Sequence, residues 1–195
     1  TLLFLRSILV TDTVAVTGTE RFFQPDEIIV SKTDLKGAIT YANRLFLSLA
    51  DYTEQEVLDA PHSIVRHPEM PRCIFKLLWE TIQSGNEIFA YVMNRSKNGD
   101  HYWVLAHVTP SYDASGAMTG FHSNRRVPDR DILNETIIPL YQNLLQVEKS
   151  NPNRKDGMEA SFQKLAQTLE DMQLSYEEFI FSLGKPQNTQ SATAA

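Results

Sequence analysis

Cysteine is almost absent from this sequence, since Cys73 is the only one among 195 residues. The chain can therefore form neither an internal disulfide nor a zinc site built from several cysteines. Structural disulfides belong to oxidising compartments, so a single thiol favours a reducing one. We expect a cytoplasmic protein.

An excess of positive charge and long apolar runs are also lacking. The chain has 18 Lys and Arg residues against 24 Asp and Glu residues, a formal net charge of −6. Binding to nucleic acid draws on many phosphate contacts, so we expect no nucleic-acid partner. The apolar start "TLLFLRSILV" is interrupted by Arg6 and is shorter than the roughly 20 residues of a membrane helix. We therefore expect no membrane span in this chain.

Short strand and helix patterns are what the sequence does contain. Asn43 stands where a helix should begin, Thr53 and Glu56 have the spacing of a capping box, and Asn98-Gly99 is a typical hairpin turn. Five strand patterns occur, at 27–31, 38–42, 87–96, 101–110 and 118–127, with a helix from Pro71 to Gly85 between the second and third. The order predicts an α+β fold, a five-stranded antiparallel sheet with short helices on one face.

The regions flanking this pattern have a different character. We predict an N-terminal cap or arm over 1–25, partly helical, before a domain over 26–127. Amphipathic helices should follow over 128–183, with a kink or break at Pro139 and a linker over 151–157. The polar end of the chain, 184–195, has the composition of a disordered tail.

The stretch "APHSIVRHPEMP" concentrates hydrogen-bonding side chains between prolines: His62, Arg66, His67 and Glu69. Four interpretations are open: a metal site, a catalytic site, a surface for an anionic cofactor, or a loop that starts a helix. A metal site from the two histidines and Glu69 lacks a fourth ligand. No nucleophile elbow or paired-carboxylate motif accompanies the stretch, so we predict that the protein is not an enzyme.

Two motifs, "PHSIVRHPEMP" and "NRSKNGDHYWV", resemble signatures of the PAS sensor domain of bacterial aerotaxis receptors, in the same order and at compatible spacing. The resemblance extends from Asp26 to Arg126. It implies a PAS fold and a non-covalently bound FAD whose redox state reports on oxygen or respiration. The partner it implies is the chemotaxis machinery or another signalling protein, and the C-terminal helices suit output or homodimer contacts.

The resemblance and the residue chemistry together give a set of candidate cofactor-binding residues. Arg66 carries a planar, permanently charged fork for phosphate oxygens. Asn94 and Asn43 can donate and accept hydrogen bonds at once, which suits the imide edge of a flavin. Tyr102 and Trp103 should point to opposite faces of a strand, so only one can line a pocket. The full set is Asn43, His62, Arg66, His67, Glu69, Trp79, Asn94 and Tyr102.

Two other functions are compatible with the sequence. A haem-binding PAS gas sensor would use His62, His67 or a strand histidine as the axial ligand. A cofactor-free PAS domain would mediate dimerisation or another protein contact. Cys73 is not in the sequence setting of the photoreactive cysteine of light-sensing flavin domains, so we predict an ordinary buried thiol.

Overall fold

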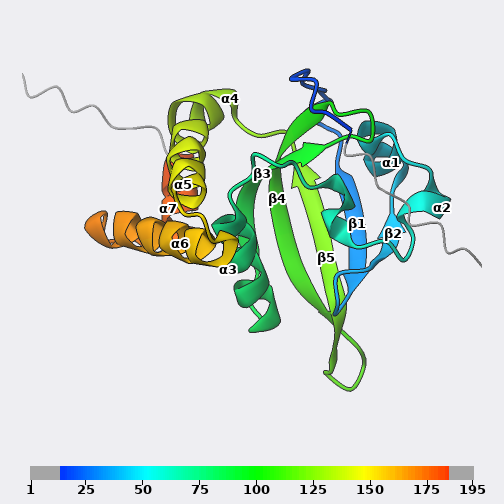
Figure 1. Cartoon of the computed structure of the whole chain (residues 1–195). Coiled ribbons are helices and arrows are strands. Elements are labelled where there is room, and N and C mark those ends of the chain that lie inside the picture. Colours follow the sequence, from blue (N-terminus) through cyan, green and yellow to red (C-terminus); the bar gives the residue numbers. More distant parts are fainter. Residues whose placement is uncertain (1–13, 185–195) are drawn as a thin grey trace, which may run out of the picture.

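Five antiparallel strands form the centre of the molecule, in the spatial order β2-β1-β5-β4-β3 (Figure 1). The structure is a computed structural model and describes residues 14–184. The strands are β1 (Ile29–Asp34), β2 (Ile39–Ala42), β3 (Ile88–Arg95), β4 (His101–Tyr112) and β5 (Met118–Arg126). The predicted five-stranded antiparallel sheet and α+β class are confirmed.

Short helices cover one face of the sheet, which we call the inner face (Figure 1). They are α1 (Arg44–Ala50), α2 (Glu54–Val57), the 3-10 turn η1 (His62–Val65) and α3 (Arg72–Gln83). Asn43 caps α1, and Thr53 and Glu56 form the predicted capping box. Local sequence therefore determines where the first two helices start.

The remaining helices lie beside α3 and the β3 side of the sheet (Figure 1). They are α4 (Arg130–Ile132), the π-helical turn η2 (Leu133–Ile137), α5 (Ile138–Ser150), α6 (Arg154–Asp171) and α7 (Tyr176–Leu183). On the outer face of the sheet Trp103 packs against Tyr141 of α5, whose hydroxyl donates to the Tyr91 carbonyl over 2.8 Å. Phe181 of α7 packs on Phe89 of β3. The C-terminal helices thus belong to the same core as the sheet.

Two expectations for this C-terminal part need correction. The helix does not break at Pro139, because the π-helical turn just before it accommodates the missing proline N–H. The linker is shorter than 151–157, because Asn153 caps α6 and the helix begins at Arg154. No described helix is long and apolar enough to cross a membrane.

The N-terminal arm lies against the turn between β3 and β4. Glu20 forms a parallel bridge with His101, and Arg21 Nε donates to Asp100 over 2.9 Å. No helix forms between residues 14 and 25, so the part of the arm that the structure describes is not helical. The rest of the arm, 1–13, and residues 185–195 of the predicted tail lie outside the described residues.

Candidate functional site

A cavity of about 600 Å³ lies between α3 and the inner face of the sheet. This volume falls within the span of roughly 300–1,000 Å³ that is usual for small-molecule sites. Its lining comes from β1, the β1–β2 turn, η1 and its flanks, α3, the strands β3, β4 and β5, and α6. The lining residues are Ser31, Thr33, Lys36, Gly37, Pro61, His62, Ser63, Arg66, Arg72, Phe75, Lys76, Leu78, Trp79, Ile82, Val92, Asn94, Ala106, Val108, Phe121, Ser123, Arg125 and Met158.

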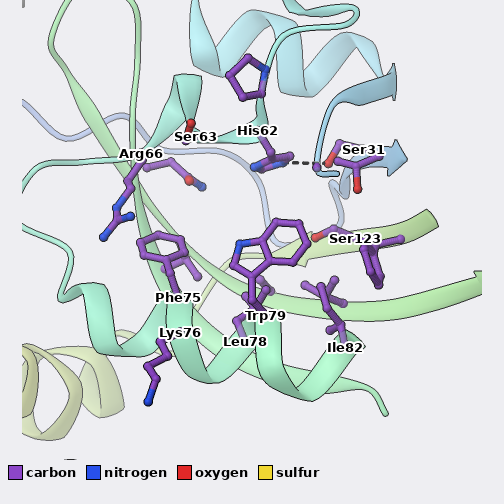
Figure 2. Close-up of a pocket in the computed structure, with 18 of the residues that line it drawn as sticks. Ser31, His62, Ser63, Arg66, Phe75, Lys76, Leu78, Trp79, Ile82 and Ser123 are labelled. Atoms are coloured by element: carbon purple, nitrogen blue, oxygen red, sulfur yellow. Dashed lines mark hydrogen bonds between the residues drawn. The ribbon is translucent and has the colours of Figure 1, made fainter. Parts of the chain in front are cut away.

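Flat and branched apolar side chains form opposite walls of the cavity. Helix α3 presents Trp79 to the cavity (Figure 2). The Trp79 ring meets Phe121 of β5 edge-on at 5.6 Å between centroids. A Cβ atom on Gly37 would lie 2.9 Å from Trp79, so the β1–β2 turn and this indole close one end. Val92 and Val108 of the sheet face the helix. The result is an apolar slot with room for a planar ligand.

Charge inside the cavity has one sign. No acidic residue is among the described lining residues. The charged residues of the lining are all cations: Lys36, Arg66, Arg72, Lys76 and Arg125. Glu148 pairs with Arg72 at 3.2 Å and Glu159 with Lys76 at 3.0 Å. Within the described part of the chain, the other three cations have no ion-pair partner. Such a cavity favours an anionic ligand.

Arg125 is the most unusual of these cations. Its residue is only 4% exposed, and burial lowers the pKa of its guanidinium to about 10. One nitrogen, Nη2, donates to Ser31 Oγ over 2.9 Å and to His62 Nε2 over 2.7 Å. The other, Nη1, is buried and has no partner among the described residues. A buried donor of this kind calls for an acceptor from a ligand.

Sequence reasoning missed Arg125. The strand period of two would have placed it on the same face as Phe121 and Ser123 of β5, inside the fold. An arginine expected on the inner face, without an obvious acidic neighbour, would have been a candidate ligand-binding residue.

His62 completes the polar end of the cavity (Figure 2). Burial, together with the nearby charge of Arg125, lowers the pKa of this imidazole to about 3. The ring is therefore neutral, and because a guanidinium can only donate, Nε2 is the acceptor and Nδ1 carries the proton. Ser31 Oγ lies 3.1 Å from the same Nε2 atom. Arg125, His62 and Ser31 form one hydrogen-bonded group.

Asn94 and Arg66, two of the candidate cofactor-binding residues, also line the cavity. Asn94 of β3 is 4% exposed, and its amide makes no hydrogen bond to any described residue. Arg66 stacks on Phe75 with its guanidinium carbon 4.2 Å from the ring centroid, and burial lowers its pKa. Both side chains are available to a ligand.

Four predicted candidates lie away from the cavity. Asn43 is committed to the backbone, because its Oδ1 accepts from Val30 and Phe46 and its Nδ2 donates to Ile28. His67 accepts the amide of Glu69 and packs on His101. The structure therefore does not bring Asn43 or His67 into the lining.

Glu69 and Tyr102 are the other two. Glu69 is exposed beside a separate groove lined by α5, and Tyr102 lies on the inner face beyond the cavity. Burial raises the pKa of Tyr102, and its hydroxyl has no partner in the described part of the chain. Trp103, on the opposite face, packs on Tyr141 instead, as strand alternation predicted.

Metal and thiol chemistry find no support in the described residues. Between 14 and 184, no three His, Cys, Asp or Glu side chains cluster as metal ligands would. Cys73 is buried against α6, where its sulfur lies 3.1 Å from Ser161 Oγ. Burial raises the pKa of this thiol to about 11, so it is protonated at neutral pH.

Comparison with known proteins identifies the domain. Residues 39–124 match the family model described as the PAS fold. The aerotaxis receptor of Escherichia coli is 42% identical over 61% of this chain and 23% of the receptor. Phototropin-2 of rice is 30% identical over 43% of this chain and 9% of that protein. The chain thus contains a PAS domain of the aerotaxis-receptor type, and it spans about a quarter or less of these relatives.

Among the similar solved structures is the light-state structure of the LOV domain of the blue-light photoreceptor Aureochrome1. It is 23% identical, covers 60% of this chain and 90% of its own, and has a TM-score of 0.49.

Proposed function

We propose that this protein is a sensory PAS module that binds FAD and reports redox or oxygen state through protein contact. The observation that carries the proposal is Arg125, a buried cation with one nitrogen that has no described partner, in a cavity whose charged lining residues are all cations. Relatedness to the aerotaxis receptor supports a sensory role.

The residues of the cavity fit a flavin. The apolar slot between Trp79 and the sheet suits a flat ring system. Asn94 offers a free amide, which can both donate and accept along a polar ring edge. Arg125 offers a donor and a positive charge, and Arg66 and Lys36 suit phosphate oxygens. Ring, edge and phosphate thus each meet a suitable group.

Bound flavin would supply a group whose charge and hydrogen-bonding pattern change on reduction. Arg125 would hold negative charge at its free nitrogen, with His62 and Ser31 keeping the guanidinium in place. When the hydrogen-bonding pattern of the ligand changes, the Asn94 side-chain amide would rotate to match it. The same strand, β3, carries Phe89 and Tyr91, which contact α7 and α5 respectively. A change at Asn94 would thereby reach the C-terminal helices.

A haem sensor is less consistent with the cavity. His62 is the histidine among the described lining residues, and its Nε2 already accepts from Arg125. Its Nδ1 would need the other tautomer to bind iron, and Arg125 would then lose His62 Nε2 as an acceptor. His67 and the strand histidines lie outside the lining.

The wider setting is also a proposal. The module would act in the cytoplasm, without catalysis, on a chemotaxis component or another signalling protein, or through a second copy of itself. The aerotaxis receptor itself extends far beyond the matched region, so its own partners do not transfer directly.

An absorption spectrum of protein purified without added cofactor tests the proposal, followed by chromatography of whatever heat releases. We expect two flavin bands and FAD in the released fraction. A sharp Soret band would indicate that the bound cofactor is haem instead of flavin. A colourless protein that also fails to take up added FAD would contradict both and leave a cofactor-free interaction domain.

A further inference from the structure

Helix α6 lies outside the region that matches the PAS family, yet it forms part of the cavity wall. Met158 of α6 is among the lining residues. Arg154 precedes it by four residues, so the two side chains share one face of the helix. The N-terminal end of α6 therefore borders the ligand site (Figure 1).

Three arginines gather at this end of the cavity, and we call them the arginine cluster: Arg66, Arg72 and Arg154. Arg72 Nε pairs with the buried Glu148, and its Nη2 donates to the Arg154 carbonyl. Arg72 and Arg154 are close enough to Arg66 to oppose its charge, while Glu148 favours it. One described carboxylate thus faces three guanidinium groups, and Arg66 and Arg154 have no described ion-pair partner.

The cluster is joined to a cavity that independently calls for a ligand. Arg125, 4% exposed, also lines this cavity, and its buried Nη1 atom has no partner among the described residues. A ligand with a polar ring at Arg125 and a phosphate group at the arginine cluster would satisfy both groups. The chemistry of the cluster selects an anionic group with several oxygens.

We propose that α6 completes the ligand site, with Met158 closing the wall and Arg154 binding the ligand's phosphate together with Arg66. This inference rests on the proposed flavin function and adds the residues that distinguish a phosphorylated flavin from the bare ring compound. Because Arg154 and Met158 reach the ligand only when α6 is docked, ligand binding and α6 docking stabilise each other.

The docked position of α6 is well defined, so the coupling has a definite structural basis. Lys76 of α3 contacts Glu159 at 3.0 Å and lies 3.7 Å from the Phe162 ring centroid. Ser161 donates to the Leu144 carbonyl of α5 over 3.0 Å. Occupancy of the cavity is therefore transmitted to α5 and α6, both outside the matched region.

A pair of neighbouring variants tests the proposal, Arg154→Gln and its control Lys155→Gln. Each removes one exposed positive charge from the first turn of α6, and by the proposal only Arg154 meets the phosphate. The affinities of ligand-free protein for FAD, FMN and riboflavin would be measured at fixed ionic strength. We expect Arg154→Gln to weaken FAD and FMN about 5- to 20-fold and to leave riboflavin unchanged, as for loss of one charge-assisted contact.

Hydrogen exchange supplies the second readout. FAD should slow exchange of the α6 amides in the wild-type protein, and riboflavin should do so much less. If FAD binds but the two variants behave alike, or if α6 exchange is unchanged while β3 and α3 are protected, the inference is wrong and the flavin proposal stands. If the wild-type chain binds none of the three flavins, the proposed function fails, and this inference with it.

Discussion

Replacing Arg125 by methionine separates its cost to the fold from its contribution to binding. Burial lowers the pKa of this guanidinium from its ordinary value to about 10. At about 1.4 kcal/mol per pKa unit, holding the charge inside the ligand-free protein costs roughly 3 kcal/mol. Methionine fills similar volume without that charge, and Ser31 and His62, 3.1 Å apart, can still bond to each other. The fold therefore loses little and is relieved of a buried charge.

We expect Arg125→Met to leave the free energy of unfolding of the ligand-free protein unchanged or to raise it by about 1–3 kcal/mol. The same change should weaken FAD binding roughly 10- to 150-fold, which corresponds to about 1.5–3 kcal/mol for a hydrogen bond to a charged donor. Urea unfolding followed by circular dichroism measures the first quantity. Quenching of flavin fluorescence during titration measures the second.

Arg126→Met is the matched control, because Arg126 is the next residue on β5 and is exposed. It should change neither quantity by much. If Arg125→Met destabilised the ligand-free protein by more than about 2 kcal/mol, the buried charge would be part of a stabilising network, contrary to our reasoning. If FAD bound equally well to both variants, Arg125 would not be a ligand contact.

Three further changes test other parts of the site. His62 should make the fold acid-sensitive, because its pKa of about 3 in the folded protein is below the unfolded value of 6.5. Its contribution to stability is complete above pH 6.5 and falls towards pH 3, at up to about 1.4 kcal/mol per pH unit. Urea titrations at several pH values should show that His62→Gln reduces this slope. Gly37→Ala should lower the free energy of unfolding by about 1–2 kcal/mol, because Gly37 has φ +83° and its new Cβ would approach Trp79; an unchanged midpoint in thermal unfolding would argue against this packing. Tyr102→Phe removes a buried hydroxyl without a described partner, so calorimetry should find stability equal or about 1 kcal/mol higher with FAD affinity unaltered, whereas a loss of affinity would place that hydroxyl at the ligand.

Local sequence determined most of the secondary structure. Asn43, Thr53 and Ser175 start helices through side-chain contacts within three residues, and Asn98-Gly99 closes the β3–β4 hairpin. The two quoted motifs were sufficient to identify the PAS domain, because their spacing is carried by the sequence itself. Of the candidate cofactor residues, His62, Arg66, Trp79 and Asn94 do line one cavity.

Only the tertiary structure decided which side chains meet. His67 adjoins Arg66 in sequence, yet it turns away to pack on His101, while Arg125 reaches His62 across 63 positions of the chain. A strand's period of two tells which face a residue occupies, but strand register and helix docking determine what stands opposite. The same limit applies to α6: its amphipathic pattern was visible, whereas the contact of Met158 with the cavity depends on how α6 packs against α3.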